Sequence, residues 1–263
     1  RKLAVIDGKI GFMGSQNSID KTYDKQKNIR RGLSWKELMV RLEGSIVRQL
    51  ELVFANDWYG ETNENLIKHI KPIKTQKQSS PFLCQLLPSG PGYTTENNLK
   101  AFNNLLYNAR FKAVITSPYF VPDESMLAAI TTAAERGVQV TLFVSEIGDQ
   151  FFVHHAQRSY YERLMQSGIN IYMYKSPTVL HSKHMTIDDD IAVIGSSNMD
   201  IRSLELNQEV SLLVKSKKFV KEMRSVEASY FRKSKKLNLE KWLKRPYSQK
   251  IVDNLARLTS GLQ

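Results

Sequence analysis

Two copies of one motif occupy this chain, and the repeat constrains the fold more than any other feature of the sequence. The complete copy comprises His181, Lys183, Asp188, Gly195, Ser196 and Asn198. A second set has the same internal spacing 181 residues earlier, and it comprises Lys2, Asp7, Gly14, Ser15 and Asn17. The position that would match the histidine falls just before Arg1. A duplicated motif at this separation predicts two halves of related structure.

The residues around each aspartate predict a tight β-hairpin. Apolar residues 185–187 and 191–194 flank the turn-forming Asp188, and residues 3–6 and 10–13 flank Asp7 in the same way. Residues two apart on a strand share a face, so His181 and Lys183 are expected to lie side by side. An imidazole beside an ammonium group is suited to handling phosphate.

The motif contains the groups that phosphoryl transfer requires. These are a nucleophile, a proton donor for the leaving oxygen and positive charge for the non-bridging oxygens. A histidine serves either of the first two roles, because its usual pKa of about 6.5 makes both protonation states accessible near neutral pH. One histidine does not fill both roles at once, which gives a chemical reason for two copies.

The duplicated pattern resembles the HKD motif of the phospholipase D superfamily. The resemblance implies two halves that meet on a pseudo-twofold axis, with one histidine forming a phosphohistidine while the other acts as general acid and then base. The resemblance assigns His181 to that pair of histidines and implies that Lys2 and Lys183 bind the phosphate. It also implies that the side chains completing the phosphate site are Ser15, Asn17, Ser196 and Asn198. Asp7 and Asp188, at hairpin turns, are expected to be the scaffold of the site.

A glutamate follows each Gly-Ser-x-Asn group at a matching position in the repeat. The segments that begin at Glu37 and Glu209 align without a gap. A carboxylate there accepts the second ring N–H of a histidine and fixes its tautomer. The resemblance implies that an acid at this position orients the histidine, which makes Glu209 the expected partner of His181. The alternative is a strand-edge acid that faces water.

The expected fold class is α/β, a phospholipase D-like fold with helices on both faces of its sheets and an incomplete first half. From residue 82 strands and helices alternate, which predicts a largely parallel sheet. The expected strands are 113–117, 138–144, 169–174 and 209–214, with 37–42 in the first half. The expected helices are 124–136, 156–166 and 219–231, with 45–58 in the first half.

The repeat also predicts the division of the chain. We expect the C-terminal part of a first half at 1–69, a linker at 70–81, a second half at 82–232 and a basic tail or helix at 233–263. The first half lacks a counterpart of residues 97–180. The expectation is therefore a chain truncated at its N-terminus, without the first catalytic histidine and nearly inactive in this form.

The excess of positive charge indicates an anionic partner. The net charge is +12, and residues 215–250 hold thirteen Lys/Arg against three Glu with aromatic residues between them. Such a stretch suits an anionic membrane interface, while the alternative is a solvated helix face. No apolar run is long enough to cross a bilayer, and the lone Cys84 fits a cytosol-facing site.

Several segments resemble the bacterial cardiolipin synthases within the superfamily. They begin at Ser117, Arg158, Gly168, Ser203 and Leu239 and extend over nearly the whole chain. The resemblance implies transfer between two phosphatidylglycerol molecules to give cardiolipin and glycerol, without metal or other cofactor. It also implies a peripheral part of a bacterial membrane protein whose spanning helices lie outside this chain. Tyr119 and Phe120 are expected to line a lipid pocket or to be core.

Three alternatives share the same residues. A phospholipase D-type phosphodiesterase differs only in using water as acceptor, and a nuclease would bind phosphates through the basic stretch with strong salt dependence. A non-catalytic remnant would need only its basic surface to bind anionic lipid. The lipid-synthase-like segments favour phosphatidylglycerol and a membrane surface over nucleic acid. His69, His154, His155 and His184 have no metal-ligand spacing, and the residues indicate no oligomeric state.

Overall fold

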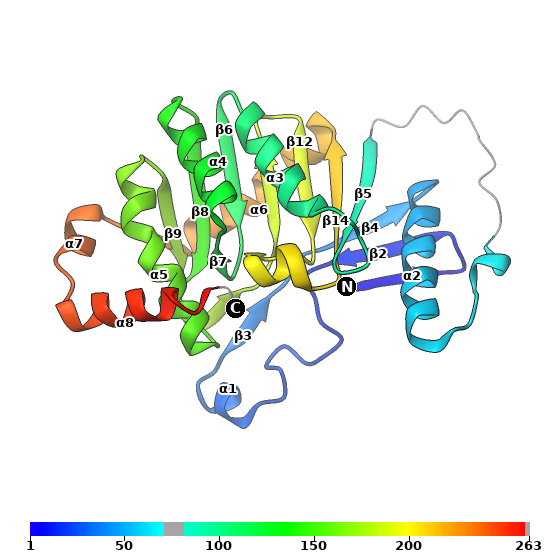
Figure 1. Ribbon diagram of the computed structural model, residues 1–263, viewed down its shortest axis with the longest axis horizontal. Coiled ribbons are helices and arrows are strands. Elements are labelled where there is room, and N and C mark those ends of the chain that lie inside the picture. Colours follow the sequence, from blue (N-terminus) through cyan, green and yellow to red (C-terminus); the bar gives the residue numbers. More distant parts are fainter. Residues whose placement is uncertain (71–81, 261–263) are drawn as a thin grey trace.

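A mixed eight-stranded sheet forms the centre of the molecule (Figure 1). The computed structural model describes residues 1–70 and 82–260. The sheet has the order β15-β9-β8-β6-β11-β12-β14-β5. Its strands are β5 (Leu83–Ser89), β6 (Lys112–Thr116), β8 (Gln139–Ser145), β9 (Asn170–Tyr174), β11 (His184–Ile187), β12 (Ile191–Gly195), β14 (Glu209–Lys215) and β15 (Ser234–Lys236).

The prediction of a largely parallel sheet is wrong. Within this eight-stranded sheet only β6, β8 and β9 pair in parallel, as the alternating helices and strands indicated. The other five pairings are antiparallel, because the β11–β12 hairpin joins the edge of β6 and β14 and β5 then extend it. The hairpin itself is confirmed, with Ile187 paired to Ile191. The motif is therefore carried by the antiparallel part of the sheet.

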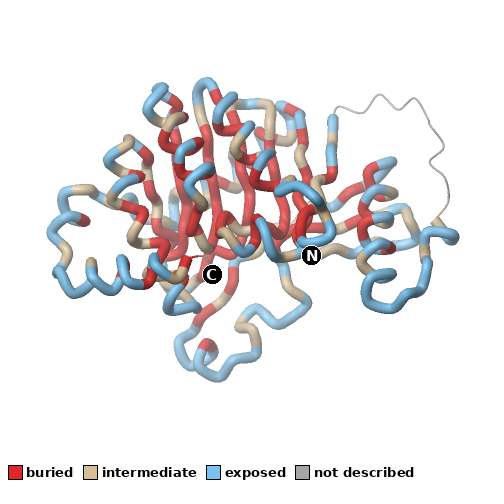
Figure 2. The backbone as a smooth tube through the Cα atoms, viewed as in Figure 1, coloured by how far each residue is buried: buried red, intermediate tan, exposed pale blue. Residues whose placement is uncertain are grey.

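Helices cover both faces of this sheet, as predicted. One face carries α3 (Asn97–Asn108), α4 (Glu124–Glu135) and α5 (Phe151–Gln166), and the other carries α6 (Lys217–Arg232). Alternating strand residues supply the two cores: Ile115 packs toward the three helices, while Val114 packs with Tyr230 of α6. The buried residues lie mainly along the strands of the sheet, as Figure 2 shows. Asp123 starts α4 by accepting the N–H groups of Ser125 and Met126.

The first half forms a separate small sheet with the order β1-β2-β4. Its strands are β1 (Leu3–Ile6), β2 (Ile10–Gly14) and β4 (Met39–Glu43), and α2 (Ile46–Thr62) packs against them. The predicted hairpin at Asp7 is confirmed by the pairing of Ile6 with Ile10. Val47 and Leu50 of α2 share one core with Leu212 and Val214 of β14, so the two halves are packed together.

A short pair of strands joins the halves where the motif begins. β3 (Ser34–Lys36) runs parallel to β10 (Thr178–Leu180), and Lys36 lies opposite Leu180. Trp35 and Val179 are buried together beneath Tyr23, which lies in the loop before the short helix α1 (Gln26–Arg30). No local pattern in the sequence marks these three-residue strands.

The remaining elements are short. They are η1 (Ile67–His69), the parallel pair β7 (Phe120–Val121) and β13 (Met199–Asp200), the π-helical turn η2 (Arg202–Leu206), and the helices α7 (Leu239–Leu243) and α8 (Tyr247–Arg257). The predicted tail at 233–263 thus begins with a sheet strand, β15, and α8 packs on α5. The predicted linker lies outside the described residues except for Ile70. Within the described ranges, no helix combines the length and apolarity needed to cross a membrane.

Candidate active site

His181 and Lys183 lie in the connection between β10 and β11 rather than within a strand. The His181 N–H donates to the carbonyl of Lys36 at 2.9 Å, so β3 holds the start of this connection. The Lys183 ammonium folds back and donates to the carbonyl of His181 at 2.6 Å. Both side chains are buried. The imidazole and the ammonium group are thus held close together, as predicted, although by a bend rather than by a strand.

Glu37 of the first half, and not Glu209, is the partner of His181. The two carboxylate oxygens of Glu37 both lie 2.8 Å from His181 Nδ1. The strand register explains the pairing: Lys36 lies opposite Leu180 at the ends of β3 and β10, so the residue that follows each strand brings Glu37 beside His181. The prediction that Glu209 orients His181 is wrong. The repeat identified the right kind of residue but did not reveal that it acts across the halves.

Each half contains the same serine–glutamate arrangement. The Ser15 hydroxyl donates to Glu37 Oε2 at 2.5 Å and accepts the N–H of Leu38 at 2.9 Å. In the second half the Ser196 hydroxyl donates to Glu209 and accepts the N–H of Val210. The serines predicted to complete the phosphate site therefore fix the two glutamates. Glu209 lies beside the start of the chain, where its carbonyl accepts Arg1 Nε at 2.9 Å.

Tyr23 is a member of the site that sequence reasoning missed. Its hydroxyl lies 3.3 Å from Glu37 Oε1 and 3.4 Å from His181 Nδ1. Asn17 donates its amide to the same hydroxyl at 2.8 Å, which places the first-half asparagine next to the pair. Tyr23 has no counterpart in the repeat, so a comparison of the two copies carried no signal for it.

Burial and neighbouring charge set the protonation of His181. Its pKa is lowered by burial and by the ammonium groups of Lys183 and Lys2, against the opposing effect of Glu37. Burial also disfavours the charged form of Glu37, but the hydrogen bond from His181 and its charge outweigh it and lower the pKa of the carboxyl. A neutral His181 that donates Nδ1–H to an ionised Glu37 carries its lone pair on Nε2. Among the described residues, Nε2 has no hydrogen-bond partner.

Lys183 is the most strongly perturbed cation of the site. Its side chain is fully buried, and burial lowers its pKa to about 7 despite the nearby carboxylates of Glu37 and Glu209. Lys2 is half-buried and close enough for its charge to act on both Lys183 and His181. An anionic phosphate placed between the two ammonium groups would relieve their mutual repulsion.

The polar groups after Ser196 complete the site. Asn198 Oδ1 is buried without a hydrogen-bond partner among the described residues. Asp200, a second residue that sequence reasoning missed, is buried, and burial raises its pKa to about 6 against hydrogen bonds from Ser203 and Asn198. The repeat offered no signal for Asp200, since Ile19 stands at the matching position of the first copy.

The two motif aspartates lie at the far ends of their hairpins. Asp188 accepts the N–H groups of Arg110, Phe111 and Lys112 at 2.8–3.1 Å, and so fixes the loop that precedes β6. Four residues of extended chain lie between Asp188 and Lys183, so the two positions are about 16 Å apart. Asp7 is exposed at the matching turn with a φ of 51°. These positions do not bring either carboxylate to His181.

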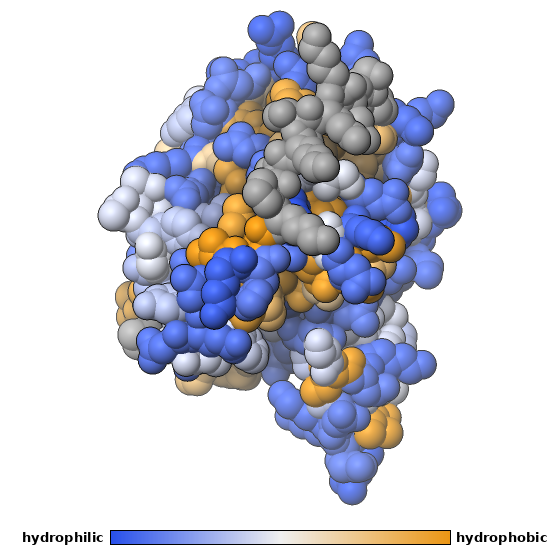
Figure 3. All heavy atoms as spheres, turned by 90° about the vertical axis from the view of Figure 1, so that its right-hand side faces the viewer, coloured by the Kyte–Doolittle hydropathy of each residue, from blue (hydrophilic) through white to orange (hydrophobic). Residues whose placement is uncertain are grey.

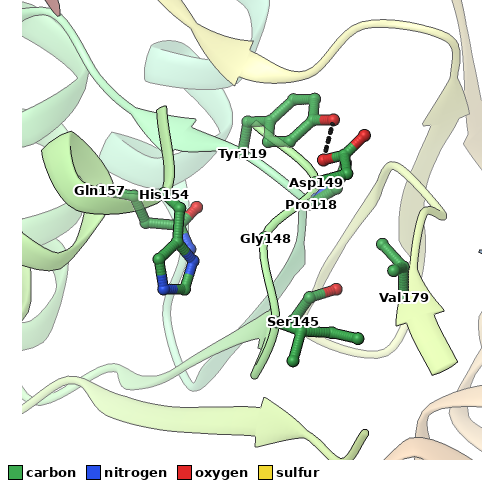
Figure 4. A pocket seen from close by; sticks show the side chains of 9 residues that line it. Pro118, Tyr119, Ser145, Gly148, Asp149, His154, Gln157 and Val179 are labelled. Carbon is green, nitrogen blue, oxygen red and sulfur yellow. Dashed lines mark hydrogen bonds between the residues drawn. The ribbon is translucent and has the colours of Figure 1, made fainter. Parts of the chain in front are cut away.

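A hollow adjoins the site between the start of α5 and β10 (Figure 4). The Tyr119 hydroxyl donates to Asp149 at 2.7 Å on one side of it, and His154 lies on the other side. Phe120, by contrast, is fully buried in the core. Of the two aromatic residues considered for a lipid pocket, only Tyr119 lines a hollow.

The other histidines have separate environments. Burial lowers the pKa of His154 to about 4, and His155 Nδ1 lies 2.7 Å from Asp253 Oδ1. The His184 side chain is completely buried beside Thr116 and Glu227. Within residues 1–70 and 82–260, no group of three or more His, Cys, Asp or Glu side chains has an arrangement that could hold a metal ion.

Comparison with known proteins shows similarity to cardiolipin synthases. The family described as cardiolipin synthase, PLD-like domain, matches residues 102–229. Cardiolipin synthase A of Wigglesworthia glossinidia brevipalpis is 35% identical over 265 residues, and that of Escherichia coli O1:K1 / APEC is 33% identical over the same length. Both alignments cover 100% of this chain but only 53% and 54% of the relatives. The chain thus spans about half the length of the curated relatives it matches.

Solved structures share the fold. The phosphatidylserine synthase of Haemophilus influenzae Rd KW20 has a TM-score of 0.72 at 14% identity, covering 98% of this chain and 69% of that one. The phospholipase D family member Nuc from Salmonella typhimurium has a TM-score of 0.52 at 17% identity, covering 60% of this chain and 99% of that one. At these identities the likeness concerns the fold alone, and it confirms the predicted phospholipase D-like architecture.

Proposed function

Because the chain belongs to the phospholipase D superfamily, we propose that it carries the site of a bacterial cardiolipin synthase, which transfers a phosphatidyl group between two phosphatidylglycerol molecules. The observation that carries the proposal is the His181–Glu37 pair, 2.8 Å apart, with two lysines beside it. The similarity to cardiolipin synthase A over 100% of this chain supports the choice of lipid. The proposed substrate is an anionic phospholipid at a bacterial membrane.

The first step is attack by His181 Nε2 on the phosphorus of one phosphatidylglycerol. Glu37 holds Nδ1–H and stabilises the positive charge that develops on the ring as the P–N bond forms. The P–O bond to the headgroup breaks, and glycerol leaves with a proton from a general acid. The resemblance to the superfamily assigns that acid to a second histidine, and we propose the Glu209 carboxylate, whose charge acts on the N-terminal ammonium group, as its counterpart of Glu37.

Fixed positive charge stabilises the transition state. Lys183 and Lys2 supply ammonium groups for the non-bridging oxygens. Binding a phosphate anion next to the buried Lys183 favours the charged form of that lysine. The site therefore gains attraction for phosphate at the moment it binds.

The second step returns the phosphatidyl group to an alcohol. A hydroxyl of another phosphatidylglycerol gives its proton to the general base and attacks the phosphorus, the P–N bond breaks, and His181 is regenerated. The products are cardiolipin and glycerol. Water in place of this alcohol would make the same site a hydrolase, so the acceptor distinguishes the two functions.

The test uses the complete gene product with phosphatidylglycerol vesicles and mass spectrometry of the lipids. We expect cardiolipin and free glycerol, both lost in His181→Ala. Phosphatidic acid without cardiolipin would contradict the transferase and identify a phosphodiesterase. Absence of lipid turnover, with cleavage of single-stranded DNA that His181→Ala abolishes, would identify a nuclease.

A further inference from the structure

The outer face of α8 is apolar and has no partner among the described residues. Its residues Tyr247, Ile251, Leu255 and Leu258 recur at helical spacing, and they are 81%, 57%, 59% and 82% exposed. The opposite face buries Asp253 and Ala256 against α5. A helix with one buried face and a second apolar face in solvent presents a surface for another apolar phase.

α8 is firmly held in this orientation. The buried Asp253 contacts His155 Nδ1 at 2.7 Å and two arginines, Arg245 Nη1 at 3.0 Å and Arg158 Nε at 3.2 Å. Both arginines also lie over the ring of Trp242 in α7. Removing the carboxylate from such a buried cluster would leave cations without a counter-charge, so the outer stripe cannot rotate inward at low cost.

Helix α8 lies along the edge of the molecule that carries the candidate site. α8, α1 and β3 occupy the lower edge in Figure 1. Side-chain contacts connect these elements. Tyr23, which lies beside His181, shares a small core with Ile147 shortly before α5. At the start of α5, Phe151 packs on His155, and His155 in turn binds Asp253 of α8. At this start of α5, Phe151 and Phe152 are 63% and 61% exposed.

Basic residues surround these apolar side chains. Residues 20–31, which include α1, hold five Lys/Arg and two Asp, and Ile29 among them is exposed. Residues 239–258 hold five Lys/Arg and two acids. Each segment therefore has a net charge of +3. Apolar residues flanked by positive charge are suited to the interface of an anionic bilayer.

Charge distinguishes this surface from the other apolar surface of the molecule. α2 also exposes apolar side chains, on the face turned to the viewer in Figure 3. Residues 43–64 around them hold five acidic residues and one arginine, a net charge of −4. An anionic membrane attracts the first surface and repels the second.

We propose that α8, together with Phe151, Phe152 and the basic loop at 20–31, is a docking surface that lays the site-bearing edge of the protein on an anionic phospholipid bilayer. α8 would lie in the plane of the interface with its outer stripe among the acyl chains. The choice of a bilayer as occupant rests on the proposed function, because the lipid substrate of that site is itself part of a bilayer.

The test compares two matched triple variants of this chain in flotation with vesicles. Ile251→Gln/Leu255→Gln/Leu258→Gln removes the stripe, and Leu52→Gln/Tyr59→Gln/Ile67→Gln removes exposed apolar residues from the α2 side. With vesicles that mix phosphatidylglycerol and phosphatidylcholine, we expect the first variant to bind about tenfold more weakly or worse and the second to bind within about twofold of the parent. Circular dichroism and thermal melting check that both variants fold.

A charge variant gives a second measurement. Lys25→Gln/Lys27→Gln in the basic loop should weaken binding to the mixed vesicles by about thirtyfold, since each basic residue near the surface contributes about 1 kcal/mol, and it should not alter the weak binding to phosphatidylcholine alone. Added salt should reduce the difference. Equal binding of parent and stripe variant to the mixed vesicles would overturn the proposal, as would equal losses in the two triple variants.

Two further results separate the docking surface from the proposed function. A parent chain that is dimeric without lipid, and that becomes monomeric in the stripe variant, would assign the stripe to a second copy and overturn the proposal. His181→Ala should bind vesicles like the parent, because docking does not use the site. Failure of cardiolipin synthesis in detergent micelles with vesicle binding intact would refute the function alone, whereas synthesis in micelles with no vesicle binding would refute the docking surface alone.

Discussion

The two copies of the motif share one polar geometry but have different surroundings. Every residue of β11 is buried, whereas β1 alternates between half-buried and exposed residues. The hydroxyl of Ser15 nevertheless engages Glu37 and Leu38 as the hydroxyl of Ser196 engages Glu209 and Val210. The comparison teaches that local strand pairing builds this geometry, and that burial decides how strongly each charged group is perturbed.

The largest expected effect comes from replacing Glu37, the carboxylate that the first half supplies to the histidine of the second half. In the complete gene product, Glu37→Gln should lower the transfer rate by about a thousandfold or more, because an amide does not hold the required tautomer of His181 or its developing charge. Nitrogen NMR of this chain gives a direct readout. Glu37→Gln should shift the His181 Nδ1–H signal, and Glu209→Gln should leave it in place. The reverse outcome would restore Glu209 as the partner.

The two motif lysines test how the difference in burial between the halves affects stability. Lys183→Met should stabilise the chain at pH 7 by about 4 kcal/mol, since a lysine whose pKa falls from 10.5 to about 7 on folding opposes folding by that amount. Lys2→Met should change stability by less than about 1 kcal/mol, because Lys2 is only half-buried. Urea unfolding measures both, and transfer activity should fall in each variant.

The same lysine predicts the pH dependence of stability. Between pH 7 and 10.5 the unfolded chain binds a proton at Lys183 that the folded chain does not hold, so parent stability should rise with pH through this interval. Lys183→Met should remove that rise. A parent stability that is flat from pH 7 to 9, or a slope retained in the variant, would show that Lys183 stays charged in the folded protein.

The hairpin turns should differ by a smaller amount. Asp188→Asn weakens three hydrogen bonds from backbone N–H groups and should reduce the free energy of unfolding by about 1–2 kcal/mol. Asp7→Asn should stay within about 0.5 kcal/mol, because asparagine tolerates the positive φ of that exposed turn. Equal losses measured in urea would mean that the two turns carry the same structural role.

The serines should give the smallest difference between the halves. Ser15→Ala and Ser196→Ala each remove a hydroxyl that bridges a glutamate and a backbone N–H, and each should reduce stability by about 1 kcal/mol. The two losses should agree within about 0.5 kcal/mol. A much larger loss at Ser196 would show that its deeper surroundings matter more than the shared geometry.

Local patterns in the sequence were sufficient to predict where helices and hairpins form, but insufficient to predict which strands pair and in which direction. The turn residues at Asp7 and Asp188 predicted both hairpins, and apolar periodicity predicted α4, α5 and α6. The direction of the sheet was predicted wrongly, because nothing in residues 184–187 records that β11 pairs with β6 in the antiparallel sense. Pairing across a sheet depends on contacts between distant segments that alternation along one segment does not encode.

The same limit applies to the site. His181, Lys183, Ser15 and Ser196 were identified because their chemistry and spacing repeat. Glu37 was recognised as the counterpart of Glu209 but not as the partner of His181, since that contact depends on the register between β3 and β10. Tyr23 reaches the site through a loop that one half has and the other lacks.

The pairing of Glu37 with His181 also has a consequence for biosynthesis. The two residues are 144 positions apart, and neither half holds both. During synthesis the carboxylate emerges from the ribosome long before the imidazole, and the ring acquires its working tautomer only when β10 closes against β3. Assembly of both halves is thus required to orient His181, because its ring lacks the Glu37 carboxylate in any partly made or partly unfolded product.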